Sequence, residues 1–90
     1  MIKVDCRGKP TSYVLARAIA ECAVENLTLH ELRVPFEFYV DLVSCALRAD
    51  ERYSASGPPQ VLGVAVTPVR ALDCVYGVDA KGHDIVKVEV

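Results

Sequence analysis

Cysteine and histidine are the side chains of this chain best suited to nucleophilic or metal chemistry, and their spacing argues against a metal site. Such a site needs three or four converging ligands and usually includes a short-spaced pair. The two histidines, His30 and His83, lie far apart, and no two cysteines form a C-x-x-C pair. The four cysteines are Cys6, Cys22, Cys45 and Cys74. We therefore expect no metal and no bound cofactor, and we expect both histidines to lie exposed in loops or at strand ends.

The cysteines could also form disulfides or serve as small buried hydrophobic residues. Cys22 and Cys45 fall within apolar stripes at helical spacing, which favours reduced thiols in the core. Residues 1–10 show no secretory signal, and no stretch of the chain reaches the ~18–20 apolar residues that span a bilayer. We expect a protein of the reducing cytoplasm that has no membrane partner.

A catalytic thiol could arise only through folding. Cys74 and His83 flank the last predicted turn, so a nucleophile and its base could meet there. Cys74 is just as well suited to a strand position that faces the core. We therefore expect no catalytic residue and no enzymatic activity, with the Cys74–His83 pair as the weaker alternative.

A short basic turn, Arg7-Gly8-Lys9, precedes the first predicted helix. Amides at a helix N-terminus can hold a phosphate or a carboxylate, which makes Arg7 and Lys9 candidate interaction residues. The alternative is a solvated surface turn, because the chain contains no G-x-x-x-x-G-K-[ST] run. The net charge of −2, with arginines interleaved among acidic residues, argues against nucleic acid as a partner.

The first half of the chain predicts two strands, each followed by a helix. Residues 1–5 alternate as in a half-buried strand, and Thr11 or Ser12 would cap a helix that ends near Asn26, a residue that tolerates the left-handed conformation. Residues 30–34 predict a second strand. Pro35 then suits the first turn of an amphipathic helix that runs to about Asp50.

The second half of the chain lacks helical periodicity. Residues 54–60 concentrate turn formers and predict an exposed loop that is more mobile than the helices. Residues 61–66 predict one strand buried on both faces, ended by Thr67-Pro68. Residues 74–78 and 85–90 predict a last pair of strands, joined by a tight turn with Gly82 at positive φ.

These elements predict one α+β domain over residues 1–90, with the order β-α-β-α-β-β-β and two helices packed on a mixed or antiparallel sheet. Hydrophobic residues make up 52% of the chain, more than the thin core of a 90-residue domain readily hides. If the last strand lies at a sheet edge, its backbone can pair with another chain. We therefore expect a homo-oligomer or another protein partner, with a candidate interaction surface formed by Val86, Val88 and Val90.

The run Asp5-Cys6-Arg7-Gly8 resembles the start of the small sulfur-carrier proteins of the TusA type. That family continues with a Cys-Pro-x-Pro motif whose cysteine, at a helix N-terminus, carries a persulfide. Here Thr11-Ser12-Tyr13-Val14 stands at the corresponding place, so the cysteine and both prolines are missing. The resemblance implies, as the alternative function, a sulfur-carrier-like or small-anion-binding protein that uses the basic turn.

A longer part of the chain resembles the axial domain of the major capsid proteins of tailed phages and of encapsulin shells, the domain nearest the symmetry axes of each capsomer. The matching segments, in the order of that family, are Ala18-Ile19-Ala20-Glu21-Cys22, Leu32-Arg33-Val34-Pro35, the helix from Tyr39 to Leu47, Asp50-Glu51-Arg52-Tyr53, Gly57-Pro58-Pro59, Val61-Leu62-Gly63-Val64-Ala65-Val66 and the strand from Asp73 to Asp79. A complete capsid subunit is several times longer, so the resemblance implies a free-standing version of this one domain. It implies a non-enzymatic phage or prophage-type protein, in the host cytoplasm or the virion, that contacts its own copies, a capsid component or a host protein.

Overall fold

The computed structural model describes the backbone of residues 1–49 and 60–90, and the side chains of residues 1–44 and 60–90. Two helices and six strands follow one another along the chain. They are β1 (Ile2–Asp5), α1 (Thr11–Val24), β2 (Glu31–Pro35), α2 (Phe36–Ala49), β3 (Gln60–Val61), β4 (Val64–Val69), β5 (Cys74–Val78) and β6 (Asp84–Glu89). The predicted α+β class is confirmed, with one strand more than the sequence indicated.

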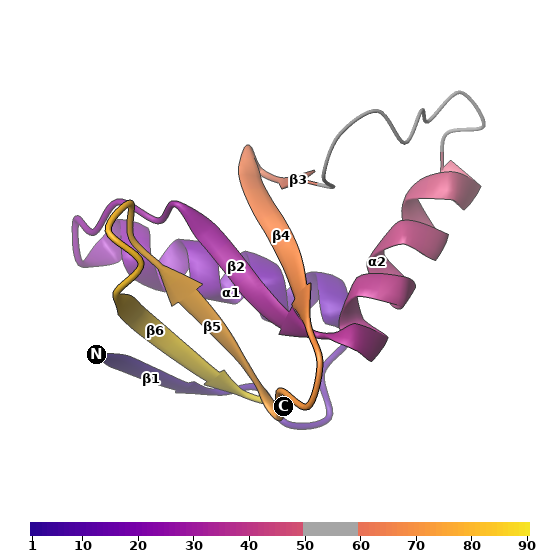
Figure 1. Cartoon of the computed structure of the whole chain (residues 1–90), viewed down its shortest axis with the longest axis horizontal. Coiled ribbons are helices and arrows are strands. Elements are labelled where there is room, and N and C mark those ends of the chain that lie inside the picture. Colours follow the sequence, from indigo (N-terminus) through magenta and orange to yellow (C-terminus); the bar gives the residue numbers. More distant parts are fainter. Residues whose placement is uncertain (50–59) are drawn as a thin grey trace.

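All six strands belong to one mixed sheet with the order β1-β6-β5-β2-β4-β3. β1 pairs with β6 and β2 pairs with β4 in parallel, whereas β5 runs antiparallel to both of its neighbours and β3 runs antiparallel to β4. The β5–β6 hairpin therefore separates β1 from β2, although those two strands are joined directly through α1 (Figure 1).

The helices supply the second layer. α1 crosses behind the strands in Figure 1 and contacts β6 and β1, whereas α2 packs on β4 and β2. The core lies between α1 and the sheet, where small and branched apolar side chains from both layers are almost completely buried. Its members include Val14, Leu15, Ala18, Cys22, Leu32, Val34, Val66, Val75, Val86 and Val88. Burial of each such side chain stabilises the fold by roughly 1.5–3 kcal/mol, apart from the smaller alanine and cysteine.

The ends of α1 differ in how well the sequence predicted them. The helix begins at Thr11 behind an extended Pro10, whose carbonyl accepts the hydrogen bond from the Val14 amide. No side chain caps this end, so the predicted cap at Thr11 or Ser12 is wrong. At the other end Asn26 adopts φ 57°, and the next amide, that of Leu27, donates to the Cys22 carbonyl. The predicted left-handed stop at Asn26 is confirmed.

The predicted single strand over residues 61–66 is wrong. Leu62 and Gly63 both have positive φ, 50° and 83°, and turn the chain between β3 and β4. A two-residue turn of this handedness matches the twist of a hairpin, which is why the apolar run divides there. Thr67 and Pro68 continue β4 instead of ending it. Pro68 is tolerated because β4 extends past the two residues of β3, so that among the described strands only β2 lies beside it there.

Two other boundaries differ from the expectations or fall outside the described chain. Pro35 is the last residue of β2, and α2 begins one residue later at Phe36, so the proline ends a strand and does not open the helix. Of the predicted loop over residues 54–60, only the last residue is described: Gln60 belongs to β3. The turn after β5 agrees with the sequence, since Gly82 has φ 83° and the Asp79 carboxylate accepts hydrogen bonds from the amides of Lys81 and His83.

The last strand does not lie at an edge. β6 runs from Asp84 to Glu89 between β1 and β5, and Val86 and Val88 have no exposed surface. Val90 follows the strand and is half-buried against the same core. The valine surface expected at β6 is therefore part of the core, because the hairpin that carries it inserts into the middle of the sheet.

Gly77 marks the tightest point of this packing. A Cβ atom at Gly77 would overlap the side chains of Val86 and Leu29, while the backbone there has no positive φ that would itself require glycine. We expect Gly77→Ala to lower the free energy of unfolding by about 1–3 kcal/mol through overpacking. Equilibrium denaturation measures this loss.

The matched control for this prediction is the double variant Gly77→Ala/Leu29→Ala. Removing the end of the Leu29 side chain relieves one of the two overlaps, while the overlap with Val86 remains. The two single losses should therefore sum to more than the loss that the double variant shows, although the double variant stays less stable than Leu29→Ala alone. If the losses of the two single variants add up to the loss of the double variant, the added methyl group does not clash with Leu29.

Candidate functional site

The basic turn after β1 is held by its own acidic neighbour. Arg7 Nε and Nη2 donate to the two carboxylate oxygens of Asp5 at 3.0 and 2.9 Å, and the Arg7 amide donates to Asp5 Oδ1 at 3.1 Å. The side-chain hydrogen bond from Arg7 is the largest cause that lowers the pKa of Asp5. Lys9 Nζ lies 5.5 Å from the centre of the Tyr13 ring. The Arg7 guanidinium is thus already engaged by a carboxylate of its own turn and is not available for bidentate binding of an added anion.

The three cysteines whose side chains are described are free and buried. Cys6 and Cys22 are 2% and 1% exposed. Burial raises the pKa of each of the three thiols, so the thiolate form that a nucleophile or sulfur carrier needs is disfavoured. Cys74 opens β5 and His83 follows its far end, so the strand separates the pair considered as nucleophile and base. Both histidines are exposed, as the sequence predicted.

The described part of the sheet ends at β1, on the side opposite β3. Among the described residues, only β6 pairs with this strand. The amide of Cys6 donates to the carbonyl of Glu89 in β6, at 2.8 Å. Because backbone groups alternate in direction along a strand, Val4 and Ile2 also face β6, and the N–H and C=O groups of Lys3 and Asp5 face outward. This outward-facing side of β1, with Lys3 and Asp5, is the β1 edge.

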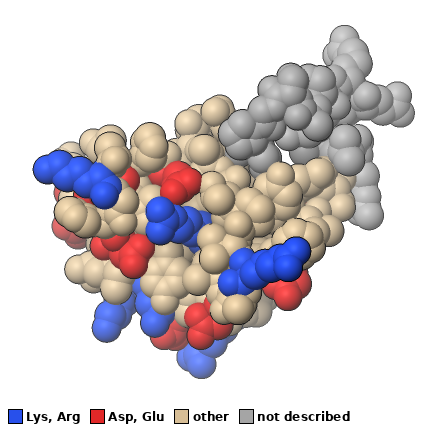
Figure 2. Space-filling model, in the orientation of Figure 1, with Lys and Arg blue, Asp and Glu red and all other residues tan. Residues whose placement is uncertain are grey.

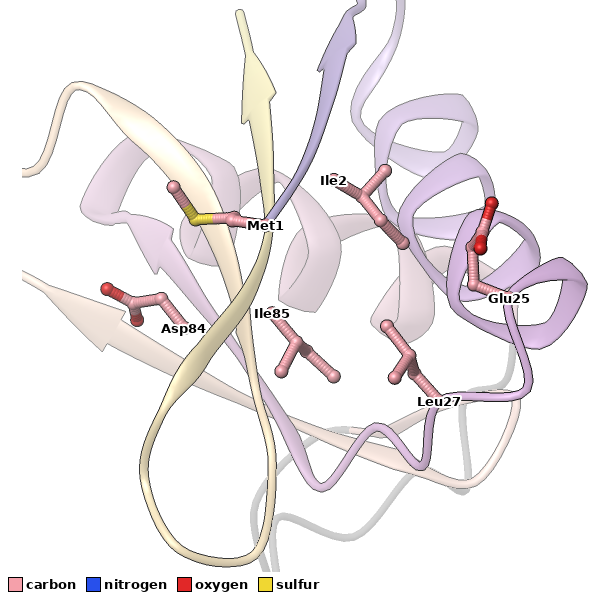
Figure 3. A pocket seen from close by; sticks show the side chains of 6 residues that line it. All are labelled: Met1, Ile2, Glu25, Leu27, Asp84 and Ile85. Carbon is pink, nitrogen blue, oxygen red and sulfur yellow. The ribbon is translucent and has the colours of Figure 1, made fainter.

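A groove of about 490 Å³ lies next to the start of the β1 edge. Its walls come from β1, β6 and the chain that follows α1, and the residues are Met1, Ile2, Glu25, Leu27, Asp84 and Ile85. Figure 3 shows Ile2, Ile85 and Leu27 turned toward one another, with Glu25 at the rim and Asp84 turned away. Met1 and Leu27 are 65% and 40% exposed, so apolar surface in and beside the groove is accessible to a partner.

The sheet face opposite the helices carries polar side chains. Glu31 accepts hydrogen bonds from the Thr67 hydroxyl at 2.7 Å and from Arg33 Nε at 3.1 Å. Lys87 Nζ lies 6.0 Å from the centre of the Tyr76 ring. Figure 2 shows acidic and basic groups interspersed over the described part of this view, without a large field of one sign. Beside these groups lies a second hollow of about 360 Å³, lined by Arg33, Val69, Leu72, Tyr76 and Asp84.

Comparison with protein-family models, with curated proteins and with solved structures finds no match. Among the described residues, no three Cys, His, Asp or Glu side chains converge as a metal site. No helix in the described part of the chain combines the length and the apolar character needed to cross a membrane.

Sequence reasoning missed the β1 edge. The alternation of Lys3 and Asp5 with apolar residues predicts a strand with one solvated face, which central and edge strands share. The position of β1 in the sheet depends on where the β5–β6 hairpin inserts, and no short-range pattern encodes that insertion. Of the five candidate residues, Arg7 and Lys9 lie just beyond the β1 edge, whereas Val86, Val88 and Val90 pack in or against the core.

We expect Cys6, Cys22 and Cys74 to resist modification in the native protein. A Cys45→Ser variant leaves these three as its only thiols, and they should react with iodoacetamide at mildly alkaline pH far more slowly than the same chain in denaturant. The reason is their burial and their raised pKa. Mass spectrometry of the alkylated protein measures the rate at each thiol. A native Cys6 that reacted as fast as an unfolded one would contradict this expectation.

The Thr67–Glu31 hydrogen bond predicts a pH-dependent contribution to stability. The Thr67 hydroxyl is the largest cause that lowers the pKa of Glu31 below its usual value of 4.5. The contribution is therefore present above that value and is lost as the pH falls through the lowered folded-state value. We expect Thr67→Val to cost about 1 kcal/mol at neutral pH and less in acid. Equilibrium denaturation of the original chain and of the variant, at pH values above and below the titration of Glu31, measures this difference. An equal loss of unfolding free energy at both pH values would contradict the prediction.

Proposed function

We propose that this chain is a non-enzymatic protein of the phage or prophage type that acts by protein–protein contact, through a strand added to the β1 edge. The observation that carries the proposal is the open backbone of Lys3 and Asp5 beside an apolar-floored groove. An extended segment placed there would form backbone hydrogen bonds with β1 and bury apolar side chains against Ile2 and Leu27. This is the physical basis of strand-addition recognition.

The charges of the β1 edge support selective contact. Lys3 and Asp5 are exposed, and charged residues on an edge strand discourage pairing with arbitrary strands. A partner must therefore present complementary charge opposite these two residues, because like charges directly across a strand pair are destabilising. Such an edge favours a specific partner over general aggregation.

The capsid-domain resemblance suggests which partners to test. It favours either further copies of this chain or a capsid or host component, with the contact made in the host cytoplasm or in a virion. Reduced thiols favour the cytoplasm, and the three described cysteines are free. The sulfur-carrier alternative gains no support from the turn, because Arg7 is engaged by Asp5 and the Cys6 thiol is buried with a raised pKa.

Amide hydrogen exchange measured by NMR tests the proposal. In dilute solution the Lys3 and Asp5 amides should exchange fast, and the Val4 amide, which faces β6, should exchange slowly. Raising the protein concentration from micromolar to millimolar, or adding a purified major capsid protein of a tailed phage, should protect Lys3 and Asp5. Protection under neither condition would overturn the proposed function.

Two variants at one position provide the control. Lys3→Pro removes the outward N–H while sparing the β1–β6 hydrogen bonds, whereas Lys3→Ala removes only the charged side chain. Protection of the Asp5 amide should be lost in the proline variant and retained at least in part in the alanine variant. Equal protection in the proline variant would place the contact elsewhere on the molecule.

A further inference from the structure

We infer that the occupant of the β1 edge is a second copy of this chain, paired antiparallel through β1 so that Val4 of each copy lies opposite Val4 of the other. The inference rests on the proposed function and specifies its partner and its register. Two sheets joined in this way would form one continuous sheet across a two-fold axis, which makes the interface self-complementary.

The outward backbone groups limit the possible registers. Only Lys3 and Asp5 of β1 point their N–H and C=O groups to the free side, so a hydrogen-bonded pair must match one of these residues with one of the same two in the second copy. A two-fold axis then allows three arrangements: Lys3 opposite Lys3, Asp5 opposite Asp5, or Lys3 opposite Asp5. The first two place like charges across the strand pair at the axis.

The third arrangement places opposite charges together twice. Lys3 of each copy lies opposite Asp5 of the other, on the solvated face of the sheet. Each of these two residue pairs exchanges two backbone hydrogen bonds, which uses all the outward groups of both residues. Asp5 also accepts hydrogen bonds from Arg7 of its own chain, so each Lys3 would join an ion pair that already exists. The strand is thus its own electrostatic complement in one register only, and this favours a second copy as the occupant.

The helix-facing side supports the same register. Val4 is 9% exposed and packs against the core of its own chain. In the paired strands the two Val4 residues form a non-hydrogen-bonded pair, in which Cα atoms approach to about 4.5 Å and side chains come closest. The row of valines formed by Val88 and Val4 would continue across the axis into the second copy.

Charge beyond the strand is complementary as well. With Val4 on the axis, residue 1 of one copy lies opposite residue 7 of the other. The basic turn of one copy, with Arg7 and Lys9, therefore lies near residue 1 of the other copy. The groove of that other copy and its exposed Glu25 lie at the same end of β1. Arg7 keeps its hydrogen bonds to Asp5 in this arrangement, so Lys9 is the residue of the turn that would favour the side on which Glu25 lies.

Charge reversal at the two paired positions tests the register. Lys3→Glu places an acid opposite Asp5 in a homodimer, and Asp5→Lys places a lysine opposite Lys3. Each variant alone should dimerise at least about tenfold more weakly than the original chain. In an equimolar mixture the introduced glutamate of one variant faces the introduced lysine of the other, and the unchanged Asp5 faces the unchanged Lys3. The mixture should therefore recover a 1:1 heterodimer of near-original affinity by sedimentation velocity.

The outcomes separate this inference from the function on which it rests. A chain that stays monomeric at millimolar concentration, or a mixture that fails to associate better than either variant alone, overturns the inference. If a phage capsid protein still protects the Lys3 and Asp5 amides, the proposed function stands with a different occupant. Circular dichroism controls for folding, and the exposed Asp5–Arg7 pair lost in Asp5→Lys should cost little stability.

Discussion

The insertion of the β5–β6 hairpin between β1 and β2 is the constraint on which the rest of this structure depends. It places the valines of β6 directly beneath α1, where they lose all exposure, and joins strands from both ends of the chain into one sheet. It also requires a residue without a side chain at Gly77, where β5 passes Val86 and Leu29. The same insertion moves β1 outward, so the strand that begins the chain becomes the end of the described sheet.

The position of β1 explains how a small domain can have both a dry core and a surface for contact. Side chains of β1 that point toward α1 complete the core, as Val4 does, while no described strand pairs with the outward backbone groups of Lys3 and Asp5. The hydrogen-bonding capacity of an edge is available without exposing the valines that hold the two layers together. The groove formed by Ile2, Leu27 and Ile85 adds apolar area where α1 ends.

Three arginines of the described chain form ion pairs with acidic residues close to them in sequence. Arg7 is bound by Asp5, Arg17 by Glu21, and Arg33 by Glu31. Each pair is local in sequence, and no buried side-chain polar atom of the described residues lacks a hydrogen-bond partner. The three described cysteines are buried and their pKa values are raised, so these thiols contribute to packing and are poor nucleophiles. The features on which the proposed contact depends are the backbone groups of β1, the charges of Lys3 and Asp5 and the apolar surface of the groove.

The sequence alone determined the α+β class, the amphipathic α1, the left-handed end at Asn26 and the turn at Gly82, because each follows from the spacing or conformational preference of neighbouring residues. It also indicated that Cys6 and Cys22 are core residues. Only the tertiary structure decided the strand order, and with it the burial of Val86 and Val88 and the exposure of β1. A valine-rich strand has the same local pattern at an edge and in the middle of a sheet. Which of the two it occupies depends on pairing between residues more than eighty positions apart, as between Ile2 and Val86.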